Sequence, residues 1–148
     1  MARRTLRLAA VFLALSLAPL AASARNTFHD LDVAKAKAEG HGHENLLDIP
    51  VFMAGQKHAA VVKDLGVFPT NMRTNAANKS DEAACQIAFL SALIRLQSKA
   101  RELGADAVVD IRSITKHRDL ESAKQYRCVA GAFVANVALQ GRMVKLAK

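Results

Sequence analysis

The clearest pattern in the chain is an apolar stripe at helical spacing that leads directly into an apolar strand. The residues of the stripe are Phe89, Leu93, Leu96, Ala100 and Leu103. Their steps of four and three residues place them on one face of a helix. Ser80 is suited to cap the start of this helix and Gly104 to follow its end. We therefore predict one long helix over 80–103, followed by a strand over 107–114.

A second group of apolar residues lies off this stripe, in the first half of the predicted helix. Ile87, Leu90 and Ile94 face away from the stripe, whereas a helix on a protein surface carries a single apolar face. Either another segment covers these side chains, or they form an oligomer or partner surface. We expect the N-terminal segment of the chain to cover them.

The region before this helix predicts one short helix and two strands. Residues 32–39 are rich in Ala and Lys, which favours a helix that ends at Gly40. Residues 49–54 and 59–68 carry the β-branched and aromatic residues typical of strands. We expect the second strand to be interrupted at 64–66, which reads Asp64, Leu65 and Gly66.

The remaining segments predict two connections and one long strand. Residues 69–79, rich in Thr, Asn and Ala, should form a loop, and 117–124 a polar connection. Residues 127–139 are apolar or small on both faces, which predicts one central strand that Gly141 ends, followed by a basic tail. Together these elements predict an α+β two-layer sandwich. Its mainly antiparallel sheet should have about four strands, with one long helix packed on one face.

The first 24 residues have the three parts of a secretory signal peptide. Three arginines precede an apolar core over 8–20, and Ala22, Ser23 and Ala24 form a small-residue cleavage site. We expect cleavage after Ala24 and a single periplasmic domain over 25–148. No cysteine stands near the cleavage site, so we expect no membrane anchor.

The net charge changes once the signal peptide is removed. Loss of its three arginines and no acids lowers the formal net charge from +8 to +5. The remaining basic residues are interspersed with acids, and the chain has one tyrosine and no tryptophan. A nucleic-acid interface needs a basic patch with aromatic platforms. We therefore expect no nucleic-acid partner.

Two cysteines, Cys85 and Cys128, are the only pair in a chain that is expected to be exported. In an oxidising compartment such a pair normally forms a disulfide, here between the first turn of the long helix and the last strand. Free reactive thiols are the alternative. They would need a C-x-x-C spacing or an adjacent activating base, and neither is present in the sequence.

A histidine turn is the one cluster with metal-ligand chemistry. His41 and His43 flank a glycine and are themselves flanked by Glu39 and Glu44. Two imidazoles on a flexible turn, with a carboxylate, could chelate copper, nickel or zinc. The alternative is an exposed polar loop without a metal, and the sequence suggests no other cofactor.

The sequence does not indicate an enzyme. It contains no G-x-S-x-G segment and no paired-carboxylate signature, and no motif places a histidine beside Cys85. Asp106 and Asp110 are interpreted as a turn residue and a strand-end residue. A polar set before the long helix could form a binding rim, although turn and cap chemistry explains it equally. This set is Asn71, Arg73, Asn75 and Asn78.

Four further segments stand out: VKDLG at 62–66, ACQ at 84–86, KARELGADAVV at 99–109 and YRCVAGA at 126–132. Together they resemble the core of RcsF, an outer-membrane stress-sensing lipoprotein. The helix-to-strand piece is also similar to YbjQ-type small domains, which have been called heavy-metal-binding.

The chain also resembles small exported proteins often labelled "excinuclease ATPase subunit". The shared segments are AGQ at 54–56, KSDE at 79–82 and AVVDI at 107–111. These resemblances imply an α/β fold with a helix-to-strand disulfide, and they imply no activity. The excinuclease label does not fit, because the chain has no G-x-x-x-x-G-K-[ST] phosphate loop and no zinc-binding cysteine quartet. RcsF has a lipid-bearing cysteine and four disulfide cysteines, so anchoring and signalling do not carry over.

Two function hypotheses follow from the sequence. The first is a disulfide-stabilised periplasmic module that binds another envelope protein or a second copy of itself. The second is a weak metal-binding or metal-buffering protein that uses the loop around His41 and His43. The histidines separate the two hypotheses, because an interaction module should not need them.

Overall fold

The computed structural model describes residues 25–148, so the predicted signal peptide and its cleavage site lie outside the described residues. The described chain is an α+β fold built on one mixed sheet. The strands are β1 (Thr27–Asp32), β2 (Val51–Met53), β3 (Val61–Asn75), β4 (Ala107–Ser113), β5 (Gln125–Ala130) and β6 (Val134–Leu146). The α-helices are α1 (Val33–Glu39) and α2 (Asp81–Glu102), and short 3-10 helices span His43–Asn45 and Thr115–His117.

The sheet has six strands, with β6 at its centre. One path of neighbours runs β1-β5-β6-β4-β2, and β3 also pairs with β6. Because a strand has two hydrogen-bonding edges, β3 occupies one edge of β6 while β5 and β4 share the other. All pairs are antiparallel except β2 with β4. The fold class and the packed long helix are confirmed. The sheet is mainly antiparallel, as predicted, with one parallel pair, but it is larger than the expected four strands.

The segment expected to be a loop over 69–79 is largely strand. β3 continues through it to Asn75, in unbroken register with β6 from Pro69 opposite Gln140 to Asn75 opposite Val134. The pairing with β6 outweighs the low strand propensity of Asn and Pro. Pro69 is tolerated because β3 is an edge strand, where a missing N–H can face outward.

The single strand expected over 127–139 is instead a hairpin of β5 and β6. The chain reverses just after Ala130, where the Gly131 N–H donates to the Val134 carbonyl at 2.9 Å. Cys128 therefore lies in β5 and not in the last strand. The sequence prediction failed here because apolar residues on both sides of the turn hide it. It also missed β1, which pairs with β5 throughout its length.

Gly141 does not end its strand, because β6 continues to Leu146. A Cβ at Gly141 would lie 2.6 Å from Val108 Cγ1 and 3.4 Å from Leu96 Cδ1. The glycine therefore lets β4 and α2 pack closely against the middle of β6. The expected basic tail is the paired end of this strand.

The ends and the buried face of α2 follow the prediction closely. Ser80 Oγ accepts a hydrogen bond from the Ala83 N–H at 3.1 Å, and Gly104 adopts a left-handed φ of 66°. Phe89, Leu93 and Leu96 are buried in the core, whereas Leu103, also expected there, is only half-buried.

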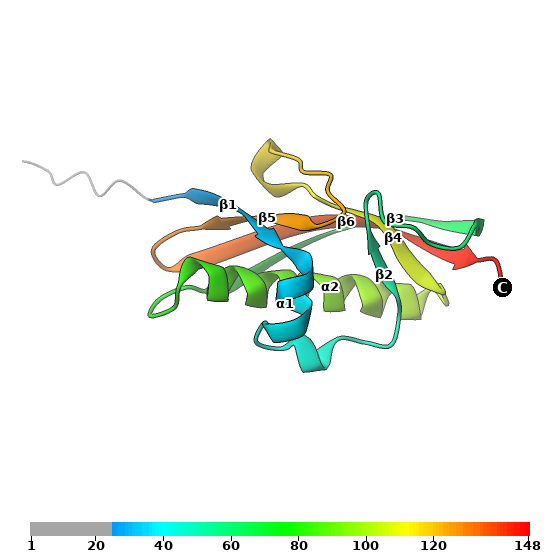
Figure 1. The fold of residues 1–148 in the computed structure, drawn as a ribbon, viewed down its shortest axis with the longest axis horizontal. Coiled ribbons are helices and arrows are strands. Elements are labelled where there is room, and N and C mark those ends of the chain that lie inside the picture. The colour runs from blue at the N-terminus through cyan, green and yellow to red at the C-terminus, as the bar shows by residue number, and fades with distance from the viewer. Residues whose placement is uncertain (1–24) are drawn as a thin grey trace, which may run out of the picture.

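The off-stripe side of α2 is partly covered by α1, as predicted. Leu90 is fully buried, and Gly40 approaches it so closely that a Cβ there would lie 2.9 Å from Leu90 Cδ1. Ile87 and Ile94 are half-buried. Figure 1 shows both α-helices on the same side of the sheet, which leaves the opposite face of the described chain without an α-helix.

Candidate functional site

The sheet face opposite α2, called here the uncovered face, carries polar side chains along its central strand. The Cα–Cβ direction of Gly141 points at Leu96 of α2. Since side chains alternate along a strand, those of Gln140 and Arg142 point to the other face. The β2–β3 and β4–β5 connections rise on this side of the sheet (Figure 1).

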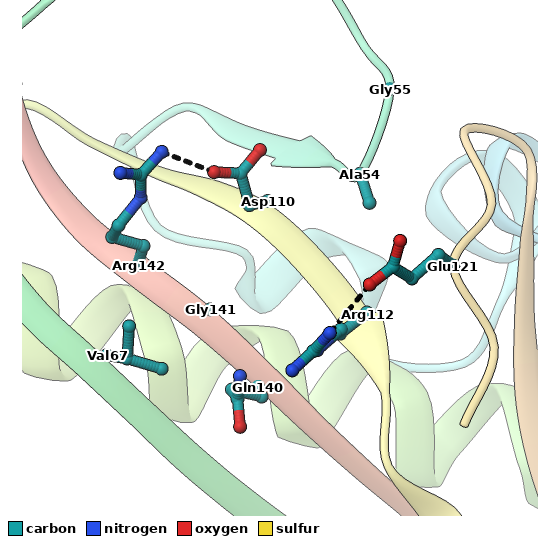
Figure 2. Close-up of a pocket in the computed structure, with 9 residues that line it drawn as sticks. All are labelled: Ala54, Gly55, Val67, Asp110, Arg112, Glu121, Gln140, Gly141 and Arg142. Atoms are coloured by element: carbon teal, nitrogen blue, oxygen red, sulfur yellow. Dashed lines mark hydrogen bonds and ion pairs between the residues drawn. The ribbon is translucent and has the colours of Figure 1, made fainter. Parts of the chain in front are cut away.

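A pocket of about 380 Å³ lies between these two connections (Figure 2). It is lined by Ala54, Gly55, Val67, Asp110, Arg112, Glu121, Gln140, Gly141 and Arg142. The lining therefore comes from both connections and from three neighbouring strands, β3, β6 and β4. Segments far apart in sequence meet here, and we take this pocket as the candidate site.

Two arginines in the pocket are held by carboxylates. Arg142 Nη2 donates to Asp110 Oδ2 at 2.5 Å, and its Nη1 donates to Asp64 Oδ2 at 3.3 Å. Arg112 Nη1 donates to Glu121 Oε1 at 2.6 Å (Figure 2). The hydrogen bond from Arg142 to Asp110 is the main reason that the pKa of Arg142 is raised. These ion pairs orient both guanidinium groups beside the pocket.

Asp110 has an unusual backbone for a residue inside a strand. Its φ is 52°, in the left-handed region that a non-glycine residue rarely adopts. The register of β4 slips at this position, both against β6 between Val109 and Arg112 and against β2. Asp110 is therefore the extra residue of a β-bulge, a device that re-aims a side chain. The expectation that it ends the strand is wrong, because β4 continues to Ser113.

The two connections beside the pocket are fastened together by Gln56. Its Oε1 accepts from the Met53 N–H, and its Nε2 donates to the Ala123 carbonyl, each at 2.8 Å. Gly55, which lies between Met53 and Gln56 in the sequence, adopts a left-handed φ of 86°. The AGQ segment at 54–56 is thus a turn that shapes one wall of the pocket. Its glycine was the only sequence signal for this role.

A second hollow of about 480 Å³ lies farther along the uncovered face. Its lining includes Asn71 and Asn136, which hydrogen-bond to each other, and Lys116 and His117. The last two have φ values of 48° and 58°, so two successive residues are left-handed. Of the expected binding rim, Asn71 lies here, while Asn75 caps a turn by accepting from the Ala77 N–H at 2.8 Å.

Asp106 forms hydrogen bonds that hold two strands together, which agrees with its interpretation as a turn residue. Its carboxylate accepts from the Leu146 N–H at 3.1 Å and from Lys145 Nζ at 3.2 Å. The hydrogen bond from Leu146 is the main cause of the lowered pKa of Asp106. Asp106 thereby ties the start of β4 to the end of β6.

The disulfide between Cys85 and Cys128 is present, with a Cα–Cα distance of 5.8 Å, and both cysteines are buried. It joins α2 to β5, next to the stacked rings of Phe89 and Tyr126, whose centroids are 3.9 Å apart. Burial raises the pKa of the Tyr126 hydroxyl well above its usual range. The disulfide lies on the helix side of the sheet and stabilises the fold without entering the pocket.

The histidine turn lies apart from the pocket, between α1 and β2. His43 Nδ1 is 3.0 Å from the Gly40 carbonyl and 3.5 Å from Glu44 Oε2, and His41 is exposed. Gly42 makes the turn with a left-handed φ of 95°. Within residues 25–148, no group of three or more His, Cys, Asp or Glu side chains is arranged to hold a metal ion.

Comparisons with protein families, curated proteins and solved structures found no match. The likeness to RcsF and to YbjQ-type domains therefore stays a prediction that rests on the quoted segments. In the part of the chain that the structure describes, no helix has the length and apolar character needed to cross a membrane.

Proposed function

We propose that the protein is a disulfide-stabilised binding module of the cell envelope, and that it recognises another protein through the pocket on its uncovered face. The observation that carries this proposal is the left-handed Asp110, held in the middle of β4 by Arg142. Such a backbone costs on the order of 1–3 kcal/mol. A residue kept in β4 at that cost is more readily explained by its position in the pocket than by fold stability.

Other strained residues support the same face. Among residues 25–148, the non-glycine residues with left-handed φ are Asn78, Asp110, Lys116 and His117. Asn and Asp tolerate this conformation in turns, and Asn78 lies in a turn, whereas Asp110 lies inside a strand. The other three line the two hollows of the uncovered face. Backbone strain clusters at functional sites, which favours this face as the binding surface.

The chemistry of the pocket suits a protein partner. Arg112 and Arg142 are each paired with acids, so the surface presents both charges beside the amide of Gln140 and the exposed side chain of Val67. Mixed charges at fixed positions give an interface specificity. Because the arginines are already held by Glu121 and Asp110, they lose little freedom when a partner binds. The partner would be another envelope protein or a second copy of this chain.

Site-specific photo-crosslinking tests which face binds. A photoreactive residue at Gln140 lies in the pocket, whereas one at Arg95 lies on the exposed side of α2. In cells that export the protein, we expect a specific crosslinked product from position 140 and none from position 95. Mass spectrometry of the product then identifies the partner, and a product of doubled mass identifies a second copy.

A matched pair of substitutions tests binding by the identified partner in vitro. Val67→Glu places an acid in the pocket, and Val62→Glu makes the same change on the same strand outside it. Both valines are exposed, so neither change should disturb folding. We expect Val67→Glu to raise the Kd for the partner at least about tenfold and Val62→Glu to leave it unchanged. Crosslinks from Arg95 alone, or equal effects of both substitutions, would contradict the proposal.

A further inference from the structure

One end of the molecule exposes a small apolar turn, called here the hairpin tip, which consists of Ala132 and Phe133 between β5 and β6 and of Val134 at the start of β6. Phe133 is 73% exposed and Val134 47% exposed, and Phe133 is the most exposed large apolar residue of the described chain. The tip does not hang free, because the Phe133 carbonyl accepts from the Ala76 N–H at 2.9 Å. Phe133 and Val134 therefore present two adjacent apolar side chains to solvent on a turn that is fixed in place.

Two cations lie near the hairpin tip. Lys79 lies in the β3–α2 loop, whose Ala76 touches the tip, and Arg73 lies two residues before Asn75, the partner of Val134. Neither Arg73 nor Lys79 forms an ion pair with any described residue, and both are exposed. Figure 1 shows the β3–α2 loop and the β5–β6 turn at the same end of the molecule. The tip is thus an apolar point with unpaired positive charge beside it.

The chain also enters the domain at this end. The Arg25 side chain donates to the Gly131 carbonyl at 3.4 Å and to Asp81 Oδ1 at 2.7 Å. A Cβ at Gly131 would lie 3.1 Å from the Arg25 carbonyl. Arg25, the first described residue, therefore lies directly beside the tip.

We propose that the hairpin tip is a peripheral docking site for an anionic lipid surface. Phe133 and Val134 would insert among the headgroups and upper acyl chains, and Arg73 and Lys79 would lie over acidic headgroups. Two observations favour lipid over a folded partner: the exposed side chains lie on a turn at one end of the molecule (Figure 1), and the two cations near them are unpaired within the described chain. Such docking is reversible and uses no anchor. It is separate from the pocket on the uncovered face.

Tryptophan fluorescence tests insertion directly, because the chain has no tryptophan of its own. Phe133→Trp reports on the tip, and Val62→Trp is the control at the opposite end of β3, ~40 Å away by strand geometry. Val62 is similarly exposed, at 65%. With vesicles of phosphatidylglycerol and phosphatidylcholine, we expect a blue shift for Phe133→Trp and none for Val62→Trp. Equal shifts, or no shift for Phe133→Trp, would overturn the proposal.

Charge and salt test the electrostatic part with the exported, processed protein. Binding to anionic vesicles in a sedimentation assay should fall with added salt and be weak on pure phosphatidylcholine. Arg73→Gln with Lys79→Gln should lower the partition coefficient more than tenfold, at about fivefold for each charge. Lys57→Gln with Lys63→Gln removes two exposed lysines elsewhere on the molecule and should have a much smaller effect. Equal losses from both pairs would mean nonspecific attraction and would overturn the assignment to the tip.

The alternative to lipid at the hairpin tip is a protein surface, which could belong to a second copy of this chain. Phe133→Ser should abolish vesicle binding without changing the melting temperature or the elution volume in gel filtration. A variant that shifts from dimer to monomer, while the wild type shows no vesicle binding, would assign the tip to self-association and overturn the lipid proposal. Vesicle binding can fail while crosslinking through Gln140 succeeds, so the two proposals are tested independently.

Discussion

The side chain of Gln97 and the backbone of Leu47 form two reciprocal hydrogen bonds inside the domain. Gln97 Nε2 donates to the Leu47 carbonyl at 2.7 Å, and Gln97 Oε1 accepts from the Leu47 N–H at 2.9 Å. The same Nε2 donates to the Ile49 carbonyl at 2.8 Å. Gln97 is buried on α2, so one helix side chain satisfies backbone hydrogen-bonding groups in the irregular segment that leads into β2.

Gln97→Leu should destabilise the protein, because it keeps the volume and removes all three bonds. The backbone groups of Leu47 and Ile49 would then lack partners, and we expect a loss of about 1–3 kcal/mol in the free energy of unfolding. Gln86→Leu is the matched control on the same helix, because Gln86 makes no side-chain hydrogen bond to the described residues. Urea unfolding curves of the two variants should differ clearly. Equal midpoints would mean that water replaces the lost bonds.

The disulfide should supply a large share of the stability. Cys85 and Cys128 are 43 residues apart, and closing a loop of that length stabilises by about 4 kcal/mol in the chain-entropy model. Cys85→Ser with Cys128→Ser should therefore lower the free energy of unfolding by roughly 2–5 kcal/mol. Thiol titration of the denatured, unreduced wild type should find no free thiol. Two reactive thiols would show that the exported protein is not bonded.

The long helix could be predicted because its signals are local. The Ser80 cap, the stripe through Leu93 and the Gly104 stop each depend on residues close by in the sequence, and each is seen in the structure. The strands were harder, because pairing is decided by distant segments. Residues 69–75 carry few strand formers and become strand only because β6 lies beside them.

The candidate site could not be predicted, for the same physical reason. The strain at Asp110 arises where the register of β4 shifts against two neighbouring strands. No residue in the AVVDI segment indicates a bulge there. Its partner Arg142 is 32 residues away in sequence. Gln56 likewise joins two connections that are adjacent only in the folded protein. The local clusters that sequence reasoning does find, such as the histidine turn, lie elsewhere.

Gly141→Ala should be destabilising even though strands usually tolerate alanine. The added methyl group would meet Val108 Cγ1 at 2.6 Å and Ile111 Cγ1 at 3.2 Å, where β4 packs against β6. Overpacking of this kind costs about 1–3 kcal/mol. Gln140→Ala, one residue earlier on the uncovered face, should change stability much less. Thermal unfolding distinguishes them, and an unchanged melting temperature for Gly141→Ala would mean that the sheet relaxes at no cost.

Acid should destabilise the protein through a few paired carboxylates. Arg127 Nε and Nη2 each donate to Asp30 at 2.7 Å, and these bonds lower the pKa of Asp30. The hydrogen bond from Arg25 likewise lowers the pKa of Asp81. Because the folded-state pKa of each of these two carboxyl groups lies below its unfolded value of about 3.9, their stabilising effect is complete above about pH 4. It is lost as the pH falls through the lowered folded-state pKa.

Urea midpoints measured from neutral pH down to about pH 3 check this expectation. The midpoint should fall with pH in the wild type and fall less in Asp30→Asn, because that variant has already lost the titrating partner of Arg127. Asp119→Asn is the control, since Asp119 is exposed and forms no ion pair within the described chain. A profile that Asp30→Asn and Asp119→Asn alter equally would locate the acid sensitivity elsewhere.

Weak metal binding by the histidine turn is the last prediction, and it tests the alternative function. If Nδ1–H of His43 donates to the Gly40 carbonyl, its Nε2 is left to bind copper or zinc, together with the exposed His41. Ordering this glycine-containing turn offsets part of the ligand-bond energy, so we expect weak binding that protons compete away at lower pH. Isothermal titration should show it in untagged protein, lost in His41→Ala with His43→Ala and kept in His117→Ala. Tight stoichiometric binding that needs both histidines would make metal handling the leading function, because a binding module that uses the uncovered face does not need this turn.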